Sequence, residues 1–141
     1  MAKFYEILLI GIPLEIIQSA CEQLNWKFKL VLPQDEKGVV QELLGGEYNL
    51  VFINSDYLKT HPHIEHIIIQ FPQEKRRRTI FILIDAELET LNPFSAFYKS
   101  VNAIVNPRDL PNLAEFLPHI IRAYEKLYRG FQKAQEELEI F

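Results

Sequence analysis

The feature that most constrains the fold is a short apolar run in mid-chain that ends abruptly in polar residues. Leu50 to Ile53 are consecutive apolar residues, and Asn54, Ser55 and Asp56 follow directly. Such an uninterrupted run of strand formers is typical of a strand buried on both faces, as in a parallel sheet covered by helices. Open α/β sheets place their functional groups where the strands end. The sequence therefore directs the search for function to Asn54 and Asp56.

Further segments with the composition of strands alternate with helical patterns along the chain. The expected strands cover residues 4–10, 26–32, 50–53, 79–84 and 101–105. Apolar residues at three- and four-residue spacing predict helices between and after them, at residues 14–24, 35–44, 60–71, 93–100 and from about 111 onward. This alternation predicts an α/β fold with a parallel sheet covered on both faces. The segment 79–84 is the most apolar and is expected at the centre of the sheet.

The composition is that of an ordinary globular protein. With 141 residues, 48% of them hydrophobic, and a formal net charge of -4, we expect a single domain spanning residues 1–141 that does not bind nucleic acid. The single cysteine, Cys21, excludes a disulfide framework and a multi-cysteine zinc site. No apolar stretch reaches the roughly 20 residues that span a bilayer. We therefore expect a cytoplasmic protein without a membrane partner.

Two local phrases accompany the alternation, E-Y-N-L-V-F-I-N at residues 47–54 and S-V-N-A-I-V-N-P at residues 100–107. Together with the segment lengths, they resemble the receiver domains of bacterial two-component response regulators. The resemblance covers roughly the first 125 residues and implies a doubly wound, flavodoxin-like sheet of five strands in the order 2-1-3-4-5.

Active receivers carry a phosphorylation site at the carboxyl edge of that sheet. Two acids bind magnesium, an aspartate accepts the phosphoryl group, and a hydroxyl and a lysine complete the set, because phosphoryl transfer needs a nucleophile, a hard cation and positive charge. The resemblance places these roles, in that order, on Gly11 and Ile12, on Asn54, on Ile84 or Asp85, and on Asn106 before Pro107. The magnesium acids, the nucleophile and the lysine are thus all replaced.

These replacements imply a pseudo-receiver, which keeps the fold, has lost the phosphorylation chemistry and uses no cofactor. Asn54 is then expected to act as a hydrogen-bonding plug for the surrounding loops. Asp56 would point to the same side as Asn54 in an extended segment. A receiver whose chemistry is displaced to Asp56 or Asp85 is therefore a further, weaker alternative.

Two charged or polar clusters lie outside this edge. His63 and His66 are one helical turn apart and could both reach a zinc or nickel ion. They are weak metal candidates, because the same pattern fits the exposed start of a helix, and no metal is expected. The basic block at residues 75–78 could meet a phosphate or an acidic partner. The favoured interpretation is a solvated loop, because no aromatic residues interleave with the charges.

The C-terminal helix carries a heptad-like apolar seam. Its members alternate at steps of four and three: Leu113, Leu117, Ile120, Tyr124, Leu127, Phe131, Ala134 and Leu138. An interior proline disfavours a helix, so we expect a short turn from Pro111 and the long helix from near Pro118. From about Leu127 the helix extends past the usual end of a receiver. Its apolar residues there either mark an interaction site or fold back on the domain.

The leading hypothesis is a non-catalytic pseudo-receiver of bacterial signalling that acts through protein contacts. The family implies a surface made by the fourth helix, the fifth strand and the last helix, and a homodimer through the C-terminal helix is a possible form. Candidate interaction residues are Phe94, Phe97, Tyr98, Tyr124, Tyr128 and Phe131. The alternative is a flavodoxin-like binding domain or enzyme that takes a small molecule or a metal. It predicts a pocket at Gly11, Asn54, Asp56, Asp85 and Asn106.

Overall fold

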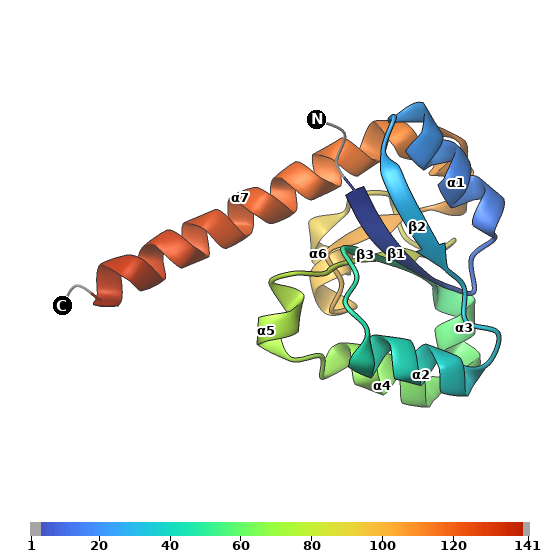
Figure 1. Ribbon diagram of the computed structural model, residues 1–141, viewed down its shortest axis with the longest axis horizontal. Helices are drawn as coiled ribbons and strands as arrows, with labels where there is room; N and C mark the ends of the chain where they lie inside the picture. Colours follow the sequence, from blue (N-terminus) through green and yellow to red (C-terminus); the bar gives the residue numbers. More distant parts are fainter. Residues whose placement is uncertain (1–3, 140–141) are drawn as a thin grey trace.

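A computed structural model describes residues 4–139, with the backbone alone described at positions 131, 132, 135, 136 and 139. Its strands are β1 (Phe4–Ile10), β2 (Lys27–Val31), β3 (Leu50–Asn54), β4 (Ile80–Ile84) and β5 (Ala103–Val105). They form one parallel sheet in the order β2-β1-β3-β4-β5 (Figure 1). This order confirms the predicted doubly wound, flavodoxin-like α/β fold. The central strand is β3, and β4, which was expected there, lies beside it.

Helices cover both faces of the sheet. They are α1 (Leu14–Gln23), α2 (Glu36–Gly45), α3 (Ser55–Thr60), α4 (Pro62–Ile69), α5 (Gln73–Arg76), α6 (Pro93–Tyr98), the 3-10 helix η1 (Pro107–Asn112) and α7 (Leu113–Glu139). Alternate strand residues point to opposite faces. Leu9 and Phe52 pack beneath α1 and α7, whereas Leu8 and Val51 pack against α2, α3 and α4. The two layers are visible above and below the sheet in Figure 1.

The segment after β3 differs from the prediction of one helix over residues 60–71. Helix α3 begins directly at Ser55, because the Asn54 side chain accepts the N–H of Asp56 and caps the first turn. His61 then leaves the helical conformation with φ −132° and ψ 67°, and Pro62 starts α4. The expected basic connection after α4 contains the short helix α5.

The prediction that the long helix begins near Pro118 is wrong, because α7 begins at Leu113. A proline at this position removes one N–H from the first turns, at a cost of about 3 kcal/mol. Leu113 and Leu117 are 1% and 0% exposed, and each buried leucine contributes about 2 kcal/mol. Tertiary packing therefore outweighs the local penalty.

The second half of α7 projects from the body of the domain (Figure 1). Leu127 and Leu138 are 64% and 76% exposed. The projecting half therefore does not fold back to bury these leucines. Within residues 4–139, no helix combines the length and the apolarity needed to cross a bilayer.

Candidate functional site

Asn54 stands at the carboxyl end of β3, and the resemblance to receivers assigned it the phosphoacceptor position. Its Nδ2 donates to the Gly11 carbonyl at 3.3 Å, and its Oδ1 accepts the Asp56 N–H at 2.9 Å. Both ends of the amide are therefore engaged with backbone. Asn54 ties the loop after β1 to the start of α3, which is what a hydrogen-bonding plug would do.

The loop after β1 carries no acidic side chain at Gly11 and Ile12, to which the resemblance assigned the magnesium acids. Gly11 has φ +71°, a conformation that favours glycine. A Cβ at this position would lie 3.0 Å from Tyr57 Cβ and 3.3 Å from Asn54 Cβ. Ile12 is 4% exposed and lies in the core with α1 and α7, as does Ile84 at the end of β4. Neither isoleucine can supply a polar group to the edge.

Asp85 follows β4 and is 5% exposed. Its Oδ1 accepts the Glu87 N–H at 2.8 Å, so the carboxylate holds the turn of its own loop. Asp56, by contrast, has a side chain that is 81% exposed and lies 3.6 Å from the Lys59 ammonium. One of the two carboxylates is therefore directed into the loop, and the other faces solvent on α3.

Asn106 closes the same edge beyond β5. Its Nδ2 donates to the carbonyls of Ala86 and Leu88 at 3.2 and 3.0 Å, and its Oδ1 accepts the Arg108 N–H at 3.0 Å. The structure thus brings Asn106 together with the loop that follows Asp85. Asn106, to which the resemblance assigned the lysine position, thus binds loop carbonyls.

The three histidines of residues 61–66 lie in two different environments. The His61 ring stacks on Tyr57, with centroids 3.9 Å apart, and its Nδ1 lies 2.9 Å from the Tyr57 carbonyl oxygen. His63 and His66 lie on the exposed side of α4. Across the described part of the chain, no three His, Cys, Asp or Glu side chains are grouped to hold a metal ion.

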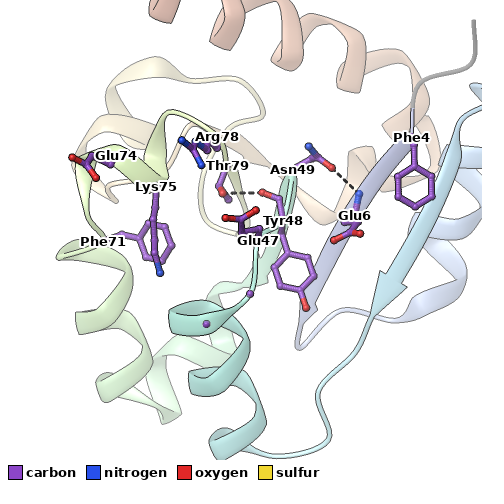
Figure 2. Close-up of a pocket in the computed structure, with 12 residues that line it drawn as sticks. Phe4, Glu6, Glu47, Tyr48, Asn49, Phe71, Glu74, Lys75, Arg78 and Thr79 are labelled. Atoms are coloured by element: carbon purple, nitrogen blue, oxygen red, sulfur yellow. Dashed lines mark hydrogen bonds between the residues drawn. The ribbon is translucent and has the colours of Figure 1, made fainter.

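A cleft of about 840 Å³ lies at the opposite, amino edge of the sheet (Figure 2). Its walls come from the starts of β1, β3 and β4, the end of α2, and α5: Phe4, Glu6, Gly45, Gly46, Glu47, Tyr48, Asn49, Phe71, Glu74, Lys75, Arg78 and Thr79. Burial, together with a hydrogen bond from the Tyr48 hydroxyl to Glu42, raises the pKa of Tyr48. No motif in the sequence indicates this cleft directly.

Several polar groups of this cleft hold its walls in place. Asn49 Oδ1 accepts the Glu6 N–H at 2.8 Å, and Thr79 Oγ1 donates to the Tyr48 carbonyl at 2.8 Å, as the dashed lines in Figure 2 show. The charged lining is mixed, with three glutamates, Lys75 and Arg78. This mixture selects no single class of ligand charge.

Arg76, between these cations, is not the solvated side chain that the basic block predicted. Its guanidinium donates to the carbonyls of Phe71, at 3.4 Å, of Ser100, at 2.9 Å, and of Ile68. The same group lies 5.3 Å from the centroid of the Phe81 ring. Arg76 therefore joins the end of α4 to the turn before β5.

A further candidate surface is the face made by α6 and α7. Phe94, Phe97 and Tyr98 on α6 are 84%, 87% and 83% exposed. A groove of about 370 Å³ separates this helix from α7, and its lining includes Leu91, Ala96, Ile120, Ala123 and Leu127. Large aromatic side chains beside an apolar groove are typical of a protein-binding surface.

The remaining candidate aromatics lie along α7. The Tyr124 hydroxyl donates to the Arg76 carbonyl at 2.7 Å, and its ring centroid lies 4.6 Å from that of Tyr128. Burial raises the pKa of Tyr124, with a further contribution from Tyr128. The side chain of Phe131 lies outside the described residues.

Comparison with known proteins supports the fold. No family model and no curated protein matches the chain. A solved structure described as a yeast Spc42 trimeric coiled coil, amino acids 181–211, fused to another structure is similar, with a TM-score of 0.59. The likeness covers 96% of this chain and 85% of that chain at 15% sequence identity. At this identity it shows the fold alone.

Proposed function

We propose that the chain is a non-catalytic, receiver-like domain that acts through protein contacts. The observation that carries the proposal is the bonding of Asn54. Its amide nitrogen and its amide oxygen both form hydrogen bonds with backbone groups. Asn106 does the same beyond β5. An edge closed in this way offers no carboxylate nucleophile at the acceptor position and no cation at the lysine position. A role in bacterial cytoplasmic signalling rests on the resemblance to receivers.

The α6–α7 face supports the second half of the proposal. Phe94, Phe97 and Tyr98 each leave more than four-fifths of their surface in water. Exposed aromatic residues contribute strongly to binding when a partner buries them. A partner that buries these rings would therefore gain binding energy from this face.

The chemical half is tested by incubation with acetyl phosphate and Mg²⁺, followed by intact mass spectrometry. We expect an unchanged mass for the wild-type chain. An acyl-phosphate adduct, mapped to Asp56 or Asp85, would contradict the proposal and support the alternative of displaced chemistry. Variants Asp56→Asn and Asp85→Asn would then identify the acceptor.

The interaction half is tested by affinity capture from the native cell with wild-type bait and with a triple variant, Phe94→Ala, Phe97→Ala, Tyr98→Ala. We expect the triple variant to lose specific partners, because it removes the exposed rings without touching the core. Phe4→Ala is the matched control, since Phe4 is also an exposed aromatic, at 56%, but lies at the amino edge. Equal capture by all three baits would contradict the assignment of this face.

The cleft of Figure 2 supports a second candidate function, the binding of a small molecule. Its volume of about 840 Å³ falls in the range of ligand pockets, roughly 300–1,000 Å³. The cleft lies at the edge opposite to the pocket expected at Gly11, Asn54 and Asn106. A ligand screen by NMR would test it. Shifts confined to Tyr48, Phe71 and Thr79 would support the candidate, and hits without shifts there would exclude it.

A further inference from the structure

Helix α7 carries one continuous apolar stripe whose surroundings change along its length. Leu113 and Leu117 are buried beneath the sheet. Ile120, Ala123 and Leu127 line the groove beside α6. Beyond Leu127 the stripe continues with Phe131, Ala134 and Leu138 at steps of four, three and four in the sequence. The projecting half therefore repeats the spacing that packs the first half.

The projecting half lacks the packing that normally stabilises a helix of its length. Isolated helices of fewer than about 12–15 residues are marginal in water, and an exposed glycine weakens them further. Leu138 is 76% exposed, and a Cβ added at Gly130 would meet no atom within 4 Å. A partner that covers the stripe would supply the missing packing.

The charges of α7 are segregated, and this pattern favours a particular arrangement of two copies. Positions 122–133 carry Arg122, Lys126, Arg129 and Lys133 with Glu125 as their one acid, and the end of the helix carries Glu136, Glu137 and Glu139. Parallel pairing of two copies would set the acidic end beside the acidic end. Antiparallel pairing would set the acidic end of one helix beside the basic stretch of the other, and it would also oppose the two helix dipoles.

We propose that two copies of this chain pair through antiparallel α7 helices, so that the acidic end of each helix lies in the α6–α7 groove of the other. An antiparallel register centred near residue 129 places Leu138 of one copy level with Ile120 of the second copy. It also places Phe131 level with Leu127. The apolar stripe of each projecting half then meets the groove-lining stripe of its partner.

The rim of the groove matches the charge of this occupant. Arg122 follows the groove-lining His119 by three positions and lies beside it, with a side-chain nitrogen 3.1 Å from His119 Nδ1. Lys126 stands in the same relation to Ala123. In the proposed register Glu137 of the second copy comes level with residue 121, next to Arg122. Two such contacts form in each dimer, because the pairing is symmetric.

This inference rests on the proposed function, since it names a second copy as the occupant of the same face. It leaves the exposed rings of α6 at the margin of the filled groove. The dimer would therefore present Phe94 and Phe97 twice, on surfaces related by a two-fold axis.

The pairing is tested by analytical ultracentrifugation of the full chain over a range of concentrations. We expect a reversible dimer for the wild type and a dissociation constant at least about 100-fold higher for Leu138→Glu and Leu127→Glu, because each places a charge in an apolar contact. Leu44→Glu, at an exposed leucine of α2, is the control and should dimerise normally. A wild-type chain that stays monomeric at every concentration would overturn the proposal, as would unchanged dimerisation of both variants.

The orientation is tested by charge exchange. Arg122→Glu and Glu137→Arg are each expected to weaken the dimer by about tenfold. The double variant Arg122→Glu, Glu137→Arg should recover the wild-type constant, because antiparallel pairing sets the exchanged charges opposite each other. Glu115→Arg makes the same change of charge at an exposed position before the paired stretch and should have little effect. A double variant that dimerises more weakly than either single variant would show that the helices are not antiparallel.

The failure of this inference is distinguishable from the failure of the proposed function. A monomeric chain whose aromatic triple variant still loses its partners would exclude the dimer and leave the proposed function intact. A dimeric chain that forms an acyl phosphate would exclude the non-catalytic proposal and leave the dimer intact.

Discussion

The two ends of the sheet are closed by different chemical groups. At the carboxyl end, side-chain oxygens of Asn54, Asp85 and Asn106 accept backbone N–H groups of the following turns and helices. At the amino end, Lys75 donates to the Leu44 carbonyl of α2, and Arg76 donates to the Ile68 carbonyl of α4. Acceptors thus serve N–H groups of segments that begin at the carboxyl end, and two cations serve carbonyls of helices that finish at the amino end.

The direction of the helices explains this difference. In a parallel sheet of this kind, helices start near the carboxyl ends of strands and finish near their amino ends. Helix starts leave N–H groups without partners, and helix ends leave carbonyls without partners. Asn54, at the end of β3, thus serves a helix start. The comparison predicts which substitutions matter at each end.

The largest effect is expected at the amino end, for Arg76→Ala. The substitution removes the guanidinium that serves three carbonyls, and hydrogen bonds to charged groups contribute about 1.5–3 kcal/mol each to stability. We expect the free energy of unfolding to fall by about 3 kcal/mol in urea titrations. Arg78→Ala, at an exposed neighbour, should change it by less than about 0.5 kcal/mol. Equal losses in the two variants would show that general basic charge, and not the half-buried guanidinium, holds this end.

The next effect is expected at the carboxyl end, for Gly11→Ala. A side chain at φ +71° is strained and would press on Tyr57 Cβ, so we expect a loss of about 2 kcal/mol in the same titrations. Gly45→Ala is the matched control, because a Cβ there meets no atom within 4 Å and alanine favours helix. A neutral Gly11→Ala variant would mean that this loop is looser than the bonds to Asn54 indicate.

A smaller effect is expected for Asn54→Asp, which introduces the acid that the resemblance to active receivers assigns to this position. Aspartate keeps the acceptor for the Asp56 N–H but loses the donation to Gly11, so stability should fall by about 1 kcal/mol. Intact mass after incubation with acetyl phosphate and Mg²⁺ should stay unchanged, because Gly11 and Ile12 supply no metal ligands. Phosphorylation of this variant would show that one residue alone separates the closed edge from an active one.

The smallest effect is confined to alkaline solution and to the amino end. Burial raises the pKa of Tyr48 above the ordinary tyrosine value of about 10. The folded state then holds the proton more tightly than the unfolded state, so this stabilisation is complete below about pH 10 and is lost as pH rises further. The melting temperature of Tyr48→Phe should fall less steeply with rising alkaline pH than that of the wild type. The exposed Tyr98→Phe is the control, and identical declines in all three proteins would contradict the assignment.

Local patterns predicted most of the fold because the buried strands are short, continuous and apolar. The strand order came from resemblance, and the sheet confirms it. Two element starts were not predictable from such patterns. Helix α3 depends on the capping bond of Asn54, and α7 begins at Leu113 because tertiary burial outweighs the local cost of Pro118.

The candidate site was predicted in part. The sequence indicated that Asn54 and Asn106 gather at one edge, and their bonds to neighbouring loops are visible there. The role of Arg76 was not predictable, because a run of four basic residues does not show which member is buried. Its acceptor at Ser100 is distant in sequence. The polar contacts before β3 and β5, by contrast, had a signal in the sequence. The phrases N-L-V-F-I-N and N-A-I-V-N each begin with an asparagine, and these residues, Asn49 and Asn102, accept N–H groups of neighbouring strands.

The hydrogen bond from Tyr124 to the Arg76 carbonyl divides α7 into two parts that differ in local stability. It attaches the middle of the helix to the domain, with buried residues before Tyr124 and the exposed Leu127 and Leu138 beyond it. In the monomer we expect slow amide hydrogen exchange in α7 before Tyr124 and rapid exchange beyond it.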